Sequence, residues 1–217
     1  MTRQKNLSAT LSEFRARLNI KNPDFAAGYQ AIVDRLTASG AGSASPGTGD
    51  GLPDFQLPDA KGRLVGLSDL LANGPLVVSM NRGHWCDFCR FELTALQDHA
   101  DQIAELGANI IAISPETQAY AKKFRARCGL TFPVLCDVDN GYALSLGLAI
   151  WVGEDLKPLY SKFGYDLERF QGNSAWMLPI PATYVVATDG RIVDCRVDPD
   201  FRNRMEPEDV IAALKTL

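Results

Sequence analysis

The first 37 residues repeat a helical hydrophobic pattern twice. In each repeat the apolar residues recur at i, i+4, i+7 and i+11, which places them on one face of an α-helix. Asn22-Pro23-Asp24 separates the repeats and predicts a helix start, because proline is favoured at the first helical position. Neither stripe can be buried by its own helix, so the pair is either the dimerisation element of a homodimer or an arm packed on the main domain. The stripes are Leu7, Leu11, Phe14 and Leu18, and Phe25, Tyr29, Ile32 and Leu36.

A low-complexity stretch follows the two helical repeats. Residues 38–51, ASGAGSASPGTGDG, contain almost no side chains large enough to be buried. A Gly/Ser-rich composition of this kind is typical of flexible linkers. The sequence therefore predicts a helical N-terminal extension over residues 1–37, a linker over 38–51 and one domain over 52–217.

Beyond the linker, apolar runs of strand length alternate with helical patterns. The first twenty residues predict a short strand, a turn at Ala60-Lys61-Gly62, a second strand and a helical turn. Three later apolar runs, LVVSM, NIIAIS and FPVLCD, predict buried strands with helices between them. One of these helices is expected to open at Ser114-Pro115-Glu116 and to end at Cys128-Gly129, with glycine as the C-cap.

The C-terminal part of the chain changes this order. ATYVVAT and RIVDCRV, on either side of Asp189-Gly190, predict a β-hairpin. Pro207, with acidic residues around it, predicts the start of a closing helix. The whole order indicates an α/β fold in which helices cover both faces of a central mixed β-sheet.

Composition and charge narrow the functional classes. The 217 residues are 46% hydrophobic and 22% charged, which is ordinary for a globular protein. The net charge of −4 leaves no basic footprint for a nucleic-acid partner. We find no N-terminal apolar segment and no run of membrane-spanning length, so we expect a cytoplasmic protein without a membrane partner.

The five cysteines provide the candidate chemistry. An odd, modest number argues against a secreted disulfide framework, and in a reducing compartment a close pair is more often catalytic or metal-binding than structural. Cys86 and Cys89 form a C-x-x-C directly after the LVVSM strand, at the start of the next helix. The positive end of that helix favours a thiolate, and the spacing brings the two sulfurs within reach of a disulfide. Arg82 would favour the anion further, whereas Asp87 opposes it.

A metal site is the weaker alternative for this pair. One C-x-x-C supplies two zinc ligands, and the sequence has no second pair with the spacing of a finger or a ribbon. The sequence therefore predicts a redox centre with neither a metal nor a bound cofactor.

The motifs around the pair resemble a known family. WCDFC is similar to the W-C-x-x-C of thioredoxins, and IPATYVVATDGRI resembles the cis-proline strand of that fold. The resemblance implies that Pro181 lies opposite the cysteines and that Pro181 and Thr183 line the substrate pocket. The wider chain resembles the peroxiredoxin branch, the AhpC/TSA family, which implies a thioredoxin-like fold with an N-terminal helical extension. The matching segments are PDFQLPDAKGRLVGLSDL, CRFEL, GLTFPVLCD and VDPDFRNRMEPEDVIAAL, and the signature R-G-x-W-C-x-x-C-x-x-E-L identifies a peroxiredoxin-like subgroup.

The resemblance implies a peroxidase, but this chain departs from the peroxiredoxin motif P-x-x-x-T-x-x-C. Aligned on that motif, Cys89 takes the position of the attacking cysteine, Cys86 replaces the threonine and Arg82 replaces the proline. The family's later arginine falls near Pro181 and is missing there. The resemblance implies that this threonine and arginine bind the peroxide and stabilise charge on its leaving oxygen. Their replacement therefore leaves open whether this chain reduces peroxides or disulfides.

Two mechanisms follow for the pair. As a hydroperoxide reductase, one thiolate attacks the peroxide and the other cysteine condenses the sulfenic acid into a disulfide. The alignment makes Cys89 the attacker, whereas helix geometry favours Cys86, the more exposed. As a protein disulfide oxidoreductase, Cys86 attacks, Cys89 resolves and Pro181 presents its backbone to the partner. Both mechanisms need electrons from a thioredoxin- or glutathione-type donor, and a thiol redox sensor is a further alternative.

Three residues beside the motif complete the candidate site. Arg82 either replaces the missing arginine or belongs to a solvated loop, and His84 either relays a proton or is part of that same loop. Trp85 is expected to pack beside the sulfurs and to shield them. Cys128 is a second candidate for the resolving thiol, while Cys136 and Cys195 alternate with apolar residues and are predicted to be packing thiols.

Overall fold

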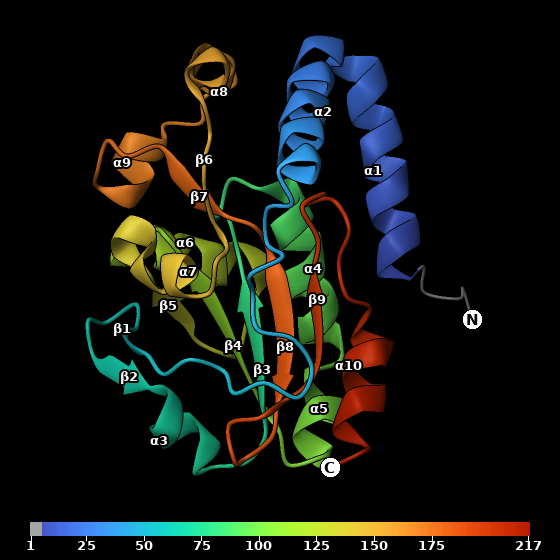
Figure 1. Ribbon diagram of the computed structural model, residues 1–217, viewed down its shortest axis with the longest axis vertical. Helices are drawn as coiled ribbons and strands as arrows, with labels where there is room; N and C mark the ends of the chain where they lie inside the picture. The colour runs from blue at the N-terminus through green and yellow to red at the C-terminus, as the bar shows by residue number, and fades with distance from the viewer. Residues whose placement is uncertain (1–5) are drawn as a thin grey trace.

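A five-stranded mixed β-sheet forms the centre of the protein, whose computed structural model describes residues 6–217 (Figure 1). The strand order is β5-β4-β3-β8-β9. β3, β4 and β5 are parallel, whereas β8 and β9 pair antiparallel to their neighbours. This arrangement confirms the predicted mixed sheet and hairpin. The strands are β3 (Leu76–Met80), β4 (Asn109–Ser114), β5 (Val134–Cys136), β8 (Ala182–Val186) and β9 (Ile192–Val197).

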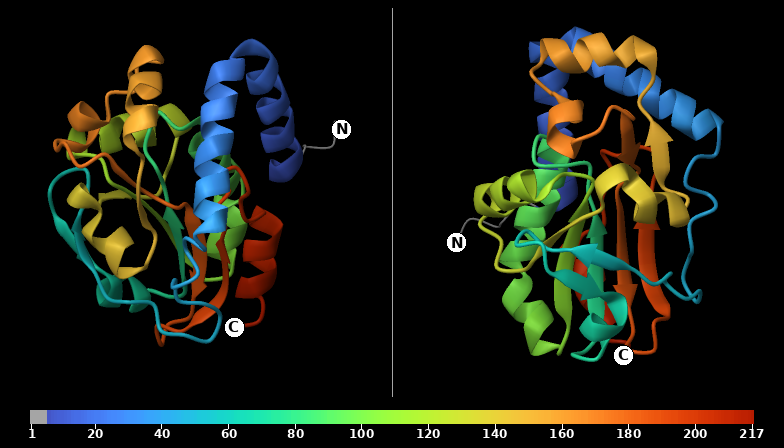
Figure 2. Two further views of the ribbon diagram at one scale, coloured as in Figure 1. Left: turned by 45° about the horizontal axis from the view of Figure 1, so that its top comes forward. Right: turned by 90° about the vertical axis from the view of Figure 1, so that its left-hand side faces the viewer.

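Helices and short hairpins bury both faces of this sheet, as Figure 2 shows from two further sides. One face packs against α4 (Asp87–Asp98), α5 (Ala100–Glu105), α6 (Gln118–Cys128) and α10 (Pro207–Leu214). The other face packs against the hairpin of β1 (Gln56–Pro58) and β2 (Leu64–Gly66), and against α3 (Leu67–Leu71) and α7 (Gly141–Ser145). The helices on both faces follow from strands that are apolar on each side.

Residues 152–176, called the insertion below, contain three short helical segments. They lie between β6 and β7, a two-stranded antiparallel sheet that the sequence pattern did not predict. The strands β6 (Ala149–Trp151) and β7 (Met177–Pro179) are three residues each, too short for a recognisable alternation. The remaining segments are η1 (Val138–Asn140), η2 (Glu154–Leu156), α8 (Lys157–Lys162) and α9 (Leu167–Gln171).

Two helix boundaries differ from the predictions. The helix expected to open at Ser114 begins at Gln118, with Thr117 at the N-cap. The prediction was wrong because Ser114 still pairs with Cys136 in the sheet, and Glu116 turns inward to bind His84. Between β3 and β4, where the sequence pattern predicts a helix, the structure has two, α4 and α5, divided at His99.

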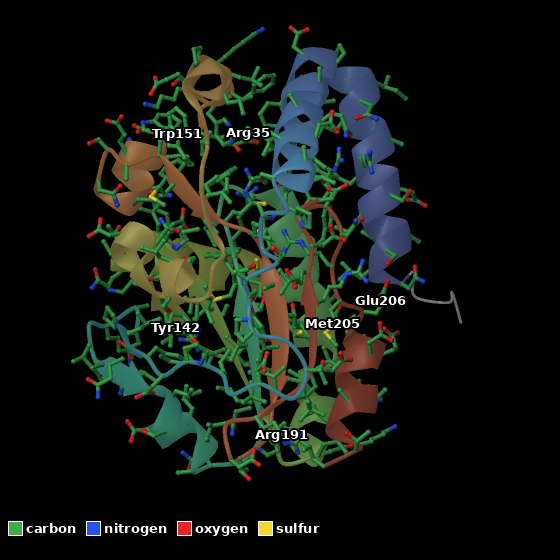
Figure 3. All side chains as sticks on the ribbon, in the orientation of Figure 1. Arg35, Tyr142, Trp151, Arg191, Met205 and Glu206 are labelled. Atoms are coloured by element: carbon green, nitrogen blue, oxygen red, sulfur yellow. The ribbon has the colours of Figure 1, made fainter. Side chains whose placement is uncertain are left out.

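The N-terminal extension forms the predicted helical hairpin of α1 (Leu7–Lys21) and α2 (Pro23–Ala38). Residues 1–5, which belong to the predicted extension, lie outside the described residues. Phe14 of α1 packs edge-on against Phe88 and Phe91 of α4, with ring centroids 5.1 and 5.3 Å apart. The first backbone N–H groups of α1 donate to the carboxylate of Glu206, at the start of α10 (Figure 3). The apolar stripes are therefore packed within the chain, and a homodimer stays a prediction.

α2 lies beside α8 at one end of the molecule (Figures 1 and 2). Phe25 of α2 packs on Phe163, which follows α8, with ring centroids 4.5 Å apart. Arg35 donates from the other end of α2 to the carbonyl oxygens of Trp151 and Val152, at 2.6 and 3.1 Å (Figure 3). The extension and the insertion thus form a joint cover over one end of the sheet.

The glycine-rich segment of residues 38–51, predicted to be a flexible linker, makes specific contacts with the sheet. Its backbone exchanges two hydrogen bonds with Ile192 of β9, through Gly49 and Asp50, at 2.9 and 2.8 Å. The hydroxyl of Ser45 lies 2.6 Å from that of Tyr184. Because the segment has small side chains, it lies close to the edge of the sheet. The division into extension, linker and domain stays a prediction.

None of the helices in the described part of the chain is both long and apolar enough to cross a membrane.

Candidate active site

The cysteine pair lies where β3 meets α4. β3 ends at Met80, and residues 81–86 turn the chain into the helix. Cys86 is the N-cap of α4 and Cys89 lies in its first turn. Both side chains are buried, with 2% and 0% of their surface exposed, and both are free thiols. A protein partner therefore cannot reach either sulfur without movement of the surrounding residues.

The sulfur of Cys89 is surrounded by hydrogen-bond donors. The backbone N–H of Arg82 lies 3.4 Å from it and Nη2 of Arg204 lies 3.3 Å from it. Burial raises the pKa of this thiol, but the S–H of Cys86, the charge and hydrogen bond of Arg204 and the Arg82 N–H together hold the pKa well below its usual range. Of the two thiols, Cys89 therefore has the lower pKa.

Cys86 titrates in the opposite direction. Burial raises the pKa of its thiol, and so does donating its proton to the Cys89 sulfur. The order of the two pKa values is therefore the opposite of the one that helix geometry alone suggested. The S–H of Cys86, the guanidinium of Arg204 and the Arg82 N–H all donate to the Cys89 sulfur.

Arg204 was not identified in the sequence as a site residue. It lies between β9 and α10, 115 residues after Cys89, and is buried. Its Nε donates to the carbonyl oxygen of Phe201 at 2.8 Å, and its Nη1 forms an ion pair with Glu92. The arginine that is missing near Pro181 is thus replaced in space by Arg204, which brings a guanidinium to the sulfur from a different segment. That segment, DFRNRMEP, lies within the C-terminal stretch that resembles the family, and this resemblance is the signal that could have pointed to its arginines.

Glu92 and Thr183 hold this arginine in place. The carboxylate of Glu92 is buried and accepts a hydrogen bond from the Thr183 hydroxyl at 2.7 Å. Burial raises the pKa of Glu92, while Arg204 and Thr183 act against that rise. The structure therefore places Thr183, predicted to line a substrate pocket, in a buried chain of contacts that runs through Glu92 and Arg204 to Cys89.

Pro181 is buried directly before β8, whose first residue, Ala182, pairs with Met80 at the end of β3. The expectation of a cis-proline is wrong, because residues 6–217 contain only trans peptide bonds. Because Pro181 is buried, a partner protein at the surface cannot contact its backbone as the disulfide oxidoreductase mechanism requires.

The side chain of Arg82 is buried in an aromatic cage, not solvated. Only 3% of Arg82 is exposed, and its Nη2 donates to the hydroxyl of Tyr160. The guanidinium carbon lies 4.0 Å from the ring centroid of Phe201, 5.1 Å from that of Trp85 and 5.4 Å from that of Tyr29. Trp85 is itself buried and packs on Tyr160, with ring centroids 5.4 Å apart. The prediction that Arg82 lies in a solvated loop is therefore excluded.

His84 is held by Glu116 and by two aromatic rings. Its Nδ1 lies 2.6 Å from one oxygen of Glu116 and its backbone N–H donates to the other at 2.8 Å. The imidazole stacks on Tyr120 and meets Phe170 edge-on. These contacts fix the loop before Cys86 to the start of α6.

Gly83 provides a stability test of this loop. Its φ is +135°, and an added Cβ would lie 2.7 Å from the carboxyl group of Glu116 and 2.8 Å from Trp85 Nε1. We expect Gly83→Ala to lower the free energy of unfolding by about 3 kcal/mol, from backbone strain and overpacking together. Gly62→Ala is the matched control, because Gly62 also has a positive φ but has open space around it. Urea denaturation of both variants checks the difference, and equal losses would contradict it.

The other three cysteines lie outside this constellation. Burial raises the pKa of each of the thiols of Cys128, Cys136 and Cys195, and that of Cys136 to about 11. This is the behaviour of packing thiols, and a resolving role of Cys128 stays untested. Among the side chains that the structure describes, no three of His, Cys, Asp or Glu are grouped so that they could hold a metal ion.

The low pKa of Cys89 predicts a pH dependence of stability. An unfolded cysteine has a pKa of about 8.5, so between that value and the folded pKa of Cys89 the unfolded chain binds more protons. The stabilisation is complete above the unfolded pKa and is lost as the pH falls through the folded pKa. In this window the free energy of unfolding of the reduced protein is expected to rise with pH relative to Cys86→Ser/Cys89→Ser, by up to about 1.4 kcal/mol per pH unit.

Urea denaturation at several pH values below 8.5 measures this difference. Cys195→Ser is the control, because the pKa of Cys195 is raised and its replacement leaves the slope unchanged. A difference that is flat with pH would show that Cys89 is not ionised in the folded protein.

Comparisons with known proteins agree on the architecture. Residues 48–195 match the family model described as the AhpC/TSA family. A Mycobacterium tuberculosis protein that carries the name peroxiredoxin is 31% identical over 145 residues, which are 67% of this chain and 81% of that protein. The thiol-disulfide oxidoreductase ResA of Oceanobacillus iheyensis is 31% identical over 149 residues, which are 66% of this chain and 62% of that protein.

Solved structures support the same fold. Peroxidoxin BcpB from Mycobacterium tuberculosis has a TM-score of 0.61 and 24% identity, with 79% of this chain and 97% of that chain covered. AhpC of Enterococcus faecalis has a TM-score of 0.59 and 17% identity, with 78% and 90% covered. At these identities the likeness shows the fold alone, and it confirms the predicted thioredoxin-like fold.

Proposed function

The chain belongs to the AhpC/TSA family of thiol oxidoreductases, and from that premise we propose that it reduces small hydroperoxides, with Cys89 as the attacking thiolate and Cys86 as the resolving thiol. The observation that carries this proposal is the environment of the Cys89 sulfur. It is fully buried, yet it receives hydrogen bonds from the Arg82 N–H and the Arg204 guanidinium.

The first step transfers oxygen to Cys89. The thiolate attacks one oxygen of the hydroperoxide, the O–O bond breaks, and a sulfenic acid forms on Cys89. The leaving alkoxide or hydroxide takes up a proton and departs as an alcohol or water. The Arg204 guanidinium, fixed by Glu92, stabilises the negative charge that moves from sulfur to the leaving oxygen.

The second step forms the disulfide. The sulfur of Cys86 attacks that of Cys89, the S–O bond breaks, and hydroxide leaves and is protonated to water. The resulting disulfide returns to the dithiol when an external thiol donor of the thioredoxin or glutathione type supplies two electrons. We place this cycle in the cytoplasm, where such donors keep thiols reduced.

Burial favours a peroxide over a protein disulfide as the oxidising substrate. A peroxide is small enough to reach a sulfur through a minor displacement of the cover, whereas a protein disulfide must be brought to the sulfur together with its chain. Trp85, which precedes Cys86, is buried as well, and its ring packs on that of the fully buried Tyr160. The buried Pro181 also offers no surface for a partner chain.

Stopped-flow measurements on the fully reduced protein test the proposal. Hydrogen peroxide and an organic hydroperoxide are each mixed with the protein, and the fluorescence of Trp85 beside the sulfurs reports the reaction; Trp85→Phe identifies its signal among the three tryptophans. We expect rates orders of magnitude above that of a free thiolate, and a Cys86–Cys89 disulfide as the product. Rates no higher than a free thiolate's, together with rapid reduction of a protein disulfide, would instead make the protein a disulfide oxidoreductase.

A further inference from the structure

Arg82 carries a buried positive charge that is not balanced by a carboxylate. Within residues 6–217 its side chain forms no ion pair, and its one side-chain hydrogen bond goes to the neutral hydroxyl of Tyr160. Its Nη1 is buried without a hydrogen-bond partner, and the same holds for Trp85 Nε1. Burying an unpaired guanidinium is costly, even with aromatic rings around it. Arg82 lies four residues before Cys86. We therefore expect a negatively charged group to stabilise its guanidinium in at least one state of the reaction.

The inventory of buried charges shows which groups can be that partner. Glu92 balances Arg204 by its ion pair, so Arg82 leaves the pocket with one excess positive charge. The Cys89 thiolate supplies the missing negative charge in the reduced protein, and the charge of Arg82 acts on both Cys86 and Cys89. When Cys89 becomes a sulfenic acid, that negative charge is gone and the excess returns.

We propose that Arg82 is a positioning residue for the second half-reaction, whose unpaired charge stabilises Cys86 as a thiolate once Cys89 has been oxidised to sulfenic acid. The charge of Arg82 thus stabilises the Cys89 thiolate in the reduced protein and the Cys86 thiolate after Cys89 has been oxidised. The proton released by Cys86 goes to the hydroxide that leaves Cys89, so that water departs as the S–S bond forms. This role rests on the proposed function.

Other titratable groups also face this pair. Among them Tyr29, Tyr160 and Tyr165 are held neutral, because burial raises the pKa of each hydroxyl. Asp87 is paired with Arg90 on the outer side of α4, and Glu116 is bound to His84. Among the described residues, Arg82 and Arg204 are the cations that act on Cys86, and of these two only Arg204 has an ion-pair partner. The groups around the pair are Tyr29 of α2, Cys89 and Glu92 of α4, Glu116 before α6, Tyr160 of α8, Tyr165 after it and Arg204 before α10.

The pH profile of Cys86 tests this role directly. In Cys89→Ser protein, iodoacetamide alkylates Cys86 only as the thiolate, and mass spectrometry of the Cys86 peptide separates it from the other three cysteines. Adding Arg82→Met is expected to raise the midpoint of the profile by about one pH unit or more, the effect of removing a nearby opposite charge. Arg82→Lys, which keeps the charge, is expected to return the midpoint most of the way. Arg17→Met, on the exposed outer side of α1, removes a charge far from the sulfurs and leaves the midpoint unchanged.

The variants are expected to fold, because methionine keeps an unbranched apolar stem like that of arginine and removes an unpaired buried charge. An unchanged midpoint in Cys89→Ser/Arg82→Met would overturn the proposal. If the methionine variant fails to fold, Arg82→Gln provides the same test, since it also removes the charge.

A second measurement separates this inference from the proposed function. With Cys89 present, one equivalent of hydrogen peroxide is added to Arg82→Met, and dimedone traps the sulfenic acid. We expect Cys89 sulfenic acid to accumulate, because disulfide formation slows about threefold for each pH unit by which the Cys86 midpoint rises: the thiolate fraction falls tenfold, and the less acidic thiolate is the stronger nucleophile. If peroxide does not oxidise Cys89 in the unaltered protein, the proposed function fails and the Cys86 profile still decides the role of Arg82. If oxidation is normal and the disulfide forms at an unchanged rate, only the role of Arg82 fails.

Discussion

Replacing Cys89 by serine is expected to abolish the reaction with hydrogen peroxide, whereas replacing Cys86 by serine is expected to leave the first step and stop the second. The reason is that the thiolate is the nucleophile and only Cys89 has a pKa held well below its usual range. The expected loss for Cys89→Ser is several orders of magnitude, down to the rate of ordinary protein thiols. In Cys86→Ser the product is a Cys89 sulfenic acid that no neighbouring thiol converts to a disulfide.

Stopped flow measures the first step, and mass spectrometry after dimedone labelling identifies the product. Cys128→Ser is the matched control, because Cys128 is also buried but has a raised pKa, and it should behave like the unaltered protein. A fast reaction that survives in Cys89→Ser and disappears in Cys86→Ser would assign the attack to Cys86. The protein would then be a peroxidase in which Cys86 attacks and Cys89 resolves.

The second large effect is expected at Arg204. Arg204→Met removes the guanidinium that contacts the Cys89 sulfur and that faces the leaving oxygen in the proposed mechanism. We expect the rate constant for hydrogen peroxide to fall by about 10²–10³-fold, the usual loss when one donor to a developing negative charge is removed. The pKa of Cys89 is also expected to rise, because the charge and the hydrogen bond of Arg204 lower it.

The pH dependence of the peroxide reaction distinguishes these two contributions. If Arg204 acts only by ionising Cys89, raising the pH restores the full rate of Arg204→Met; if it also stabilises the leaving oxygen, a deficit remains at high pH. Arg196→Met, an exposed arginine of β9 with no contact to the sulfurs, is the control. A rate equal to that of the control at every pH would show that Arg204 has neither role.

The fold was largely predictable because it depends on local periodicity. The runs at residues 76–80 and 109–114 are apolar almost throughout, which favoured buried strands, and the order of elements implied a mixed sheet. The two N-terminal stripes likewise predicted helices that needed partners. What the pattern missed were short or displaced elements, such as β6 and β7, where three residues carry no period.

The two sulfurs of the site could be identified from the sequence alone, because a C-x-x-C at a strand–helix junction depends only on neighbouring residues. Which sulfur is ionised depends instead on tertiary contacts. Arg204 reaches Cys89 through the turn after β9, and Glu92 and Thr183 fix it there. Tertiary packing likewise leaves Arg82 buried without an ion-pair partner. It also buries Pro181, whose preceding peptide bond is trans. Charge acts through distance in space, and the groups that set the chemistry of Cys89 are brought to it by the sheet from segments about a hundred residues away along the chain.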